Sequence, residues 1–152
     1  HEPLRDIKLG EPLSNEELLQ LDCTVLVPAA LSEQITEANA AKLRCRILAE
    51  GANGPTTLEA DRILTDKGVF IIPDILANSG GVIVSYFEWV QDVQRFFWKA
   101  KDIQDRLQDI ITSAFHRTLH FSLERRTTMR MAALMSGIDK VAQAHLQRGL
   151  YP

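Results

Sequence analysis

The sequence has few cysteines and no long apolar run, and these two absences exclude several classes of protein. Only Cys23 and Cys45 occur in 152 residues, too few for a disulfide-rich scaffold. We expect both to be free thiols beside strands, with a disulfide between them as the alternative. No apolar stretch reaches the roughly 18–20 residues of a membrane-spanning helix, and residues 1–6 lack an apolar signal-peptide core. We therefore expect a cytoplasmic protein without a membrane partner.

Strong charge and a phosphate-binding glycine pattern are also missing. The net charge is −3 and no basic run exceeds the pair Arg125 and Arg126, which argues against nucleic acid as a partner. No G-x-G occurs, although that pattern opens the first half of dinucleotide-binding domains. The chain starts at His1 without an initiator methionine. We interpret it as a fragment of a longer protein, with a length typical of one domain.

The first half of the chain alternates between helices and apolar strands. Ser14 and Glu17 form a capping box that predicts a helix over residues 15–20. The continuous apolar run at 24–27 predicts a strand buried on both faces, and the alanine-rich run 35–43 predicts a helix. Residues 46–49 predict a second strand, which a turn at 51–55 ends.

A second capping box, Thr56 with Glu59, predicts the next helix, and Gly68 occupies the usual glycine position after a helix. Residues 69–72 then predict a third strand. Strand, helix, strand, helix, strand at this spacing predicts two βαβ units and therefore a parallel sheet.

The second half is predicted to be helical. One helix should span about 81–94, and two more follow from apolar stripes at 103–119 and 131–146. The fold class is therefore α/β, a partial Rossmann-type doubly wound parallel sheet followed by C-terminal helices. We expect residues 1–94 to be the second half of a dinucleotide-binding domain and residues 95–152 to pack on it as one compact unit.

Four segments, in order, resemble one family. They are 26–31 (LVPAAL), 49–57 (AEGANGPTT), 72–89 (IPDILANSGGVIVSYFEW) and 148–152 (RGLYP). Together they resemble the distal cofactor domain of hexameric glutamate dehydrogenases, in the glutamate/leucine/phenylalanine/valine dehydrogenase family. The resemblance implies that the parent enzyme depends on NAD or NADP and is a homo-oligomer. It further implies that the enzyme converts L-glutamate to 2-oxoglutarate and ammonia. It also implies that the catalytic lysine and aspartate belong to another domain, so this chain should be inactive alone.

Small residues and an amide follow the first two strands. Ala29 and Ala30 would let a flat ring or ribose lie against the backbone, or they could simply pack in a strand-ending turn. Asn53 could be a turn residue in the left-handed region, or it could offer its amide to a carboxamide or a ribose hydroxyl. The resemblance implies that Ala29, Ala30 and Asn53 contact the cofactor.

The third strand leads into a second group of candidates. Asn78 could cap the following helix, and the resemblance implies that it also lies near nicotinamide and substrate. Gly81 would admit the amino-acid head of the substrate without a side-chain clash. Val82 and Ser85 are three residues apart and share a helix face. The resemblance implies that they line the substrate side-chain pocket, whereas a helix serine can also bond its own backbone.

Other polar residues have ordinary structural interpretations. His116 and His120 have an i, i+4 spacing that can hold a metal, but a solvated helix face is the favoured interpretation and no metal is expected. Asp74, which follows Pro73, should fix a turn, and Glu88 should lie on a helix surface.

Three functions remain open. The first is the cofactor-domain fragment of a glutamate dehydrogenase. The second is a non-catalytic α/β fragment that self-associates through its sheet edge or its helices. The third is part of a leucine- or phenylalanine-type dehydrogenase, although those enzymes depart from the VSYFE string at 84–88.

Overall fold

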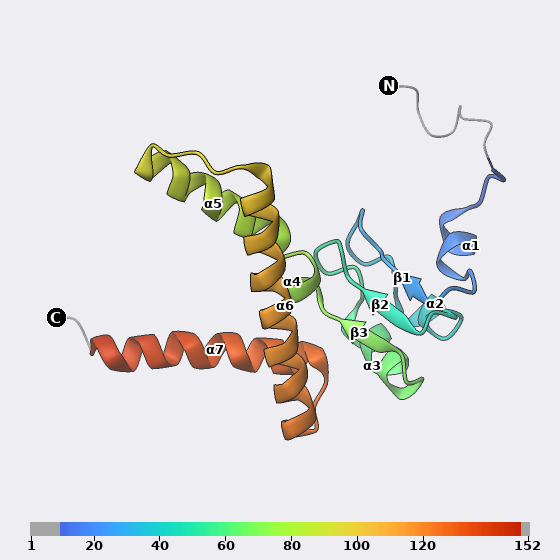
Figure 1. Cartoon of the computed structure of the whole chain (residues 1–152). Helices are drawn as coiled ribbons and strands as arrows, with labels where there is room; N and C mark the ends of the chain where they lie inside the picture. The colour runs from blue at the N-terminus through green and yellow to red at the C-terminus, as the bar shows by residue number, and fades with distance from the viewer. Residues whose placement is uncertain (1–9, 150–152) are drawn as a thin grey trace.

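The sheet of this computed structural model, which describes residues 10–149, has three parallel strands (Figure 1). Strands β1 (Val25–Leu26), β2 (Ile47–Ala49) and β3 (Phe70–Ile72) lie in the order β1-β2-β3. Val25 pairs with Ile47, and Ile47 pairs with Phe70. The predicted parallel sheet is therefore confirmed. The start at residue 1 and most of the 148–152 segment lie outside the described residues.

Within residues 10–149, four short helices accompany the sheet and three long ones follow it. The short helices are α1 (Asn15–Leu19), α2 (Glu37–Ala40), α3 (Leu58–Asp66) and α4 (Asp74–Ala77). The long helices are α5 (Gly80–Gln94), α6 (Ala100–Arg125) and α7 (Met129–Arg148). The predicted order of elements is confirmed except for α4, which the sequence analysis missed. No helix among residues 10–149 is long and apolar enough to cross a membrane.

The core joins the sheet to helices α1, α2 and α3. Its fully or almost fully buried side chains come from all of these elements: Leu19, Ile35, Ala40, Leu43, Cys45, Leu48, Ala60, Leu64 and Ile71. Cys23 packs against this cluster, and both cysteines are free. Burial raises the pKa of the Cys45 thiol, so this group is a neutral core side chain at physiological pH.

Strand β1 is a strand as predicted, but the prediction that it is buried on both faces is wrong. Val25 is 48% exposed and Val27 is 55% exposed. The reason is topological, because β1 is an edge strand that pairs with β2 alone. An apolar sequence run reports what a strand can bury, whereas the neighbouring elements decide what it does bury.

Local signals at the helix ends were correct in two cases out of three. The capping box of Ser14 and Glu17 is present at α1, and Gly68 follows α3 with a φ of 77°. The cap of α3, however, is Thr57, whose side chain accepts from the N–H of Ala60. Thr56 instead bridges to Ile35 in a parallel pair. That extended pairing also explains why α2 begins at Glu37 rather than at residue 35, and the helix ends at Ala40, before the predicted residue 43.

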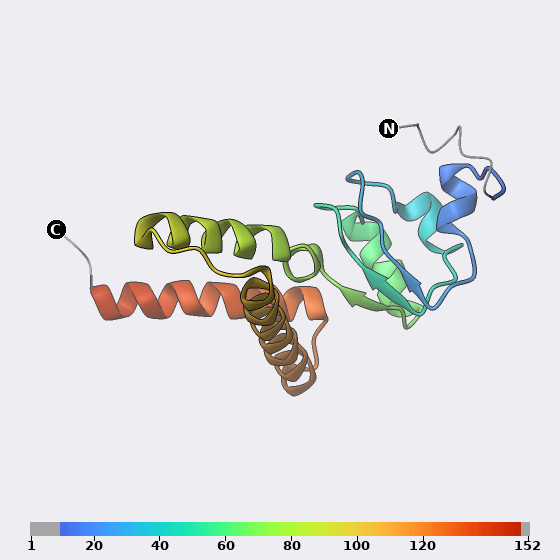
Figure 2. The ribbon, with the colours of Figure 1, turned by 45° about the horizontal axis from the view of Figure 1, so that its top comes forward.

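The long helices form a frame beside the sheet (Figure 2). Helix α6 contacts α4, α5 and α7, and α7 also contacts β3. Helices α5 and α7 extend away from the sheet and carry exposed apolar side chains, including Val82, Trp89, Val93, Ile138, Val141 and Leu146. The division at residue 94 falls where α5 ends, and it stays a prediction.

Replacing Leu64 by alanine should lower the free energy of unfolding by about 2–5 kcal/mol, because the fully buried side chain leaves a cavity between α3 and the sheet. Leu58, in the same helix, is 69% exposed. Leu58→Ala should therefore change the free energy by less than about 0.5 kcal/mol. Urea unfolding of the two variants measures the difference, and equal losses would contradict this assignment of the core.

Candidate functional site

A cleft opens where the carboxyl ends of the strands meet. Its volume is about 650 Å³, and its walls come from the loops after β1 and β2 and from the start of α5: Ala30, Leu31, Ser32, Gly51, Ala52, Asn53, Asn78 and Val82. In open α/β sheets ligands bind beyond the carboxyl ends of the strands. The structure therefore brings four of the predicted site residues to one cavity.

Two asparagines meet across this cleft. The side-chain amide nitrogen of Asn78 donates to the side-chain oxygen of Asn53 at 2.6 Å. Asn53 is exposed and Asn78 is half-buried. This bond uses one polar atom of each amide, which leaves the Asn53 nitrogen as a donor and the Asn78 oxygen as an acceptor. The pair therefore presents complementary hydrogen-bonding groups to a ligand in the cleft.

Asn53 does not adopt the left-handed conformation that would have made it a simple turn residue. The left-handed residue of this loop is Gly54, with a φ of 54°. Asp74 holds the glycine in place, because its Oδ2 accepts from the N–H of Gly54 at 2.8 Å. Asp74 therefore fixes the distant loop after β2, whereas the prediction concerned the turn at Pro73.

The prediction that Asn78 caps the helix after the third strand is wrong. Asn78 is the C-cap residue of α4, and its backbone N–H donates to the carbonyl of Asp74 at 2.9 Å. Ser79 stands at the N-cap of α5 in a helical conformation, and its hydroxyl donates to the carbonyl of Leu76. Because α4 runs almost directly into α5, no extended residue is left to cap α5. The Asn78 side chain is instead free to reach Asn53.

Ala29 and Gly51 bring the first two loops into close contact. A Cβ on Gly51 would lie 2.9 Å from the Cβ of Ala29 and 3.3 Å from a methyl group of Val27. The N–H of Ala52 donates to the carbonyl of Pro28 at 2.9 Å, which ties the same loops together. Ala29, which is exposed, therefore lies against the Gly51 loop and lines a second hollow, of about 640 Å³, between β1 and α1 rather than the cleft.

Gly81 and Ser85 lie in α5, before and after Val82 in the sequence. Neither lines the cleft, although Val82 between them does. A Cβ on Gly81 would meet nothing within 4 Å, so the backbone there is open to approach. Ser85 is exposed one turn beyond Val82 on the same face of α5. The cleft as the structure shows it therefore includes Val82 alone of these three α5 residues.

A buried carboxylate supports the rim of the cleft. The side chain of Glu50, directly after β2, is fully buried. Its Oε2 accepts from the N–H of Asp74 at 2.9 Å, and its Oε1 lies 2.7 Å from Nη2 of Arg130. Arg130, in the first turn of α7, also donates from Nε to Asp61 Oδ1 at 2.9 Å, and its Nη1 lies 3.5 Å from Asp74 Oδ1. Three carboxylates thus surround one guanidinium.

The carboxylates of this cluster keep the Arg130 guanidinium protonated. Burial alone would lower the pKa of Arg130, but hydrogen bonds and attraction from Glu50 and Asp61 outweigh that effect and raise the pKa above its ordinary value. Arg130 is therefore a permanent cation. This cluster was not predicted from the sequence. The signal that could have revealed it was the lone acid at the end of the central apolar strand, since buried acids require partners.

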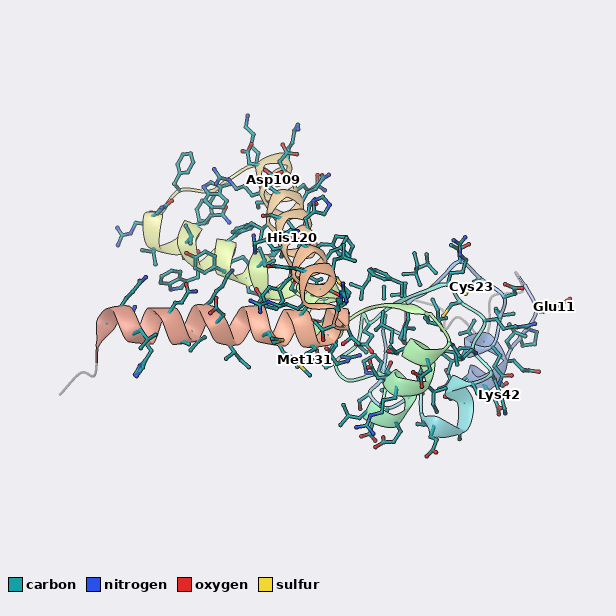
Figure 3. The ribbon with its side chains drawn as sticks, turned by 90° about the horizontal axis from the view of Figure 1, so that it is seen from below. Glu11, Cys23, Lys42, Asp109, His120 and Met131 are labelled. Carbon is teal, nitrogen blue, oxygen red and sulfur yellow. The ribbon has the colours of Figure 1, made fainter. Side chains whose placement is uncertain are left out.

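Metal-binding groups are scarce in the described part of the chain. No group of three or more histidine, cysteine or acidic side chains within residues 10–149 could hold a metal ion. His116 and His120 are exposed on α6. Figure 3 shows His120 among the long helices and Cys23 in the sheet layer, well apart from each other.

Comparison with known proteins identifies relatives over nearly the whole chain. Residues 3–149 match the model of the family described as glutamate/leucine/phenylalanine/valine dehydrogenase. Glutamate dehydrogenase of Thermotoga maritima is 49% identical over 143 residues, covering 94% of this chain and 34% of the relative. The cryptic catabolic NAD-specific glutamate dehydrogenase of Bacillus subtilis is 47% identical over 140 residues, covering 92% and 33%.

Solved structures agree with the sequence matches. Hetero-hexameric glutamate dehydrogenase from Thermus thermophilus, in its leucine-bound form, superposes with a TM-score of 0.87 at 31% identity, covering 92% of this chain and 34% of that one. The chain spans about a third of the length of the curated relatives that it matches. The predicted family and the Rossmann-type fold are confirmed.

Replacing Gly51 by alanine should destabilise the protein by about 1–3 kcal/mol, because the added methyl would overlap Ala29. Gly137→Ala is the matched control, since a Cβ there meets nothing within 4 Å and alanine favours the helix interior of α7. Thermal unfolding of both variants tests the close approach of the two loops. A Gly51→Ala protein as stable as the Gly137→Ala protein would refute it.

Proposed function

The chain belongs to the glutamate/leucine/phenylalanine/valine dehydrogenase family, and on that premise we propose that it forms one wall of the active-site cleft of an NAD-dependent glutamate dehydrogenase. The reaction converts L-glutamate, NAD⁺ and water to 2-oxoglutarate, ammonium, NADH and a proton. The observation that carries the proposal is the Asn53–Asn78 pair in a cleft at the carboxyl ends of parallel strands. Some relatives are named NAD-specific glutamate dehydrogenases, and this favours NAD over NADP as the cofactor.

The cleft suits the nicotinamide end of a dinucleotide. Its small residues, Ala30 and Gly51, leave room for a flat ring against the backbone, and Ala29 lies against Gly51. The free donor of Asn53 and the free acceptor of Asn78 match a carboxamide or ribose hydroxyls. When bound, the dinucleotide supplies the hydride acceptor, and the protein residues orient it and exclude water.

The substrate would lie against α5. The N-terminus of this helix carries a partial positive charge that favours a carboxylate, and Gly81 leaves its backbone open to one. Val82, 70% exposed, would pack against the substrate methylenes. The hydroxyl of Ser85, one turn on, could then donate to the distal carboxylate of glutamate. Asn78 would stand between this pocket and the nicotinamide.

In this proposal, none of the described residues acts as the general acid or base. The catalytic lysine and aspartate that the resemblance implies would come from another domain facing this wall. The isolated chain would therefore be inactive. The parent enzyme would be an oligomer, in keeping with the hetero-hexameric neighbour from Thermus thermophilus, and we propose that its subunits are copies of a single chain.

The proposal is tested with the full-length protein that contains this chain. Purified protein is incubated with NAD and L-glutamate, L-leucine or L-phenylalanine, and the absorbance of reduced nicotinamide is followed. We expect turnover of glutamate in preference to the other two. Preference for leucine or phenylalanine would assign the chain to the other branch of the family, and no turnover of any of them would reject an amino-acid dehydrogenase.

Replacing Ser85 by alanine in the full-length enzyme should lower kcat/KM for glutamate by the equivalent of about 1–3 kcal/mol, the worth of one hydrogen bond to a charged group. Ser85→Thr keeps the hydroxyl and serves as the matched control, which should retain most of the activity. Steady-state kinetics at saturating NAD provide the measurement. An unchanged kcat/KM in Ser85→Ala would remove the carboxylate role from this residue.

A second proposal concerns the 152-residue chain by itself, as a non-catalytic unit that self-associates. Exposed apolar side chains at the β1 edge and along α5 and α7 favour it, with Val25, Val27 and Val141 among them. Exposed apolar patches of this kind are typical of surfaces that another protein segment covers.

The isolated chain should bind NAD only weakly, with a Kd above roughly 10 μM, because it contains no G-x-G loop to hold the pyrophosphate. Isothermal titration measures the affinity, and analytical ultracentrifugation of the same sample reports association. Binding tighter than this value would contradict the account of where the pyrophosphate is held.

A further inference from the structure

Arg130 joins elements that are distant in sequence. It hydrogen-bonds Asp61, 69 residues away on α3, and Glu50, 80 residues away at the end of β2. It also lies 3.5 Å from Asp74 at the start of α4. We propose that Arg130 is a positioning residue that sets the spacing of Asn53 and Asn78 through Glu50 and Asp74. This inference rests on the proposed function only in taking the ligand of the cleft to be a nicotinamide dinucleotide.

The path from Arg130 to Asn53 is short and consists of hydrogen bonds. Arg130 holds one oxygen of Glu50, and the other oxygen of Glu50 accepts from the backbone N–H of Asp74. The side chain of Asp74 in turn accepts from the N–H of Gly54, the neighbour of Asn53. The loop after β2 is thereby tied to the start of α4.

The path to Asn78 uses the same aspartate. The N–H of Asn78 donates to the carbonyl of Asp74 at 2.9 Å, across the single turn of α4. Both asparagines are therefore located relative to Asp74, one through its side chain and one through its backbone. A shift of Asp74 would change the geometry of their 2.6 Å contact.

Charge balance makes Arg130 necessary for this geometry. The side chain of Glu50 is fully buried, and those of Asp61 and Asp74 are only 16% and 18% exposed. Without the guanidinium these carboxylates would repel one another in a poorly solvated space. Asp74 is more exposed than Glu50, the carboxylate to which its backbone is bonded, and it can therefore move toward solvent. Such a movement would break its hydrogen bond with Gly54.

A lysine could supply the charge without the geometry. Arg130 uses Nε, Nη1 and Nη2 toward three different carboxylates, which requires the planar fork of a guanidinium. Arg130→Lys should therefore fold, yet it should hold the rim less well. Arg148, exposed at the far end of the same helix, provides the matched control Arg148→Lys.

The first measurement needs no ligand. Hydrogen–deuterium exchange is compared in the full-length protein and its Arg130→Lys and Arg148→Lys variants. We expect faster exchange at residues 51–56 and 74–78 in Arg130→Lys alone, with residues 37–40 of α2 unchanged. Unchanged exchange at the rim in a folded Arg130→Lys protein would overturn the proposal, whatever the enzyme does.

The second measurement separates positioning from a general loss of structure. NADH and ADP, which lacks both the nicotinamide and the ribose attached to it, are each titrated into the same proteins well below their unfolding temperatures. We expect Arg130→Lys to weaken NADH binding about tenfold or more, since small misplacements of positioning groups are costly. ADP affinity should change less than about twofold, because ADP carries neither the carboxamide nor the nicotinamide ribose that the asparagine pair is proposed to contact. Equal losses for both ligands, or none, would count against positioning.

The two hypotheses fail in different ways. If the unsubstituted protein binds no NADH, the proposed function fails, while the exchange experiment still decides the role of Arg130. If Arg130→Lys does not fold, Glu50→Gln is the second variant, because it keeps the shape and removes the charge that Arg130 binds. Normal exchange at the rim and normal NADH binding in Glu50→Gln would then overturn the proposal.

Discussion

A fully buried carboxylate at the end of the central strand is the constraint on which the site depends. Glu50 has no solvent to stabilise its charge, so its oxygens must be bonded within the protein. Arg130 satisfies one oxygen and the backbone of Asp74 the other. These bonds connect β2, α4 and α7, which the chain itself separates widely. The rim of the cleft thus has a defined shape because an acid is buried beneath it.

The cleft combines this rigid support with small residues at its surface. Gly51 allows the loops after β1 and β2 to touch, and Gly54 takes a backbone conformation that other residues rarely adopt. Asn53 and Asn78 then meet at hydrogen-bonding distance. The polar groups at the opening are therefore preorganised by packing below them, which is the arrangement that precise binding of a flat polar ligand requires.

The rest of the surface fits a wall that faces another part of a larger protein. Strand β1 has an exposed edge, and α5 and α7 carry large apolar side chains in solvent. The chain also spans only about a third of the relatives that it matches. In the proposed enzyme these faces would contact the remaining domain, which would supply the acid–base groups.

The sequence alone determined the order of strands and helices apart from α4, the parallel sheet, and the positions of Asn53 and Asn78 near the strand ends. These features depend on short-range signals, such as the Ser14–Glu17 capping box, Gly68 after α3 and the apolar runs of the strands. The resemblance of whole segments added the family. Tertiary structure alone decided the exposure of β1, the extended pairing of Ile35 with Thr56, and the release of Asn78 from a capping role. It also decided that Glu50 and Arg130 pair across 80 residues, because no local pattern specifies which distant charge reaches a buried acid.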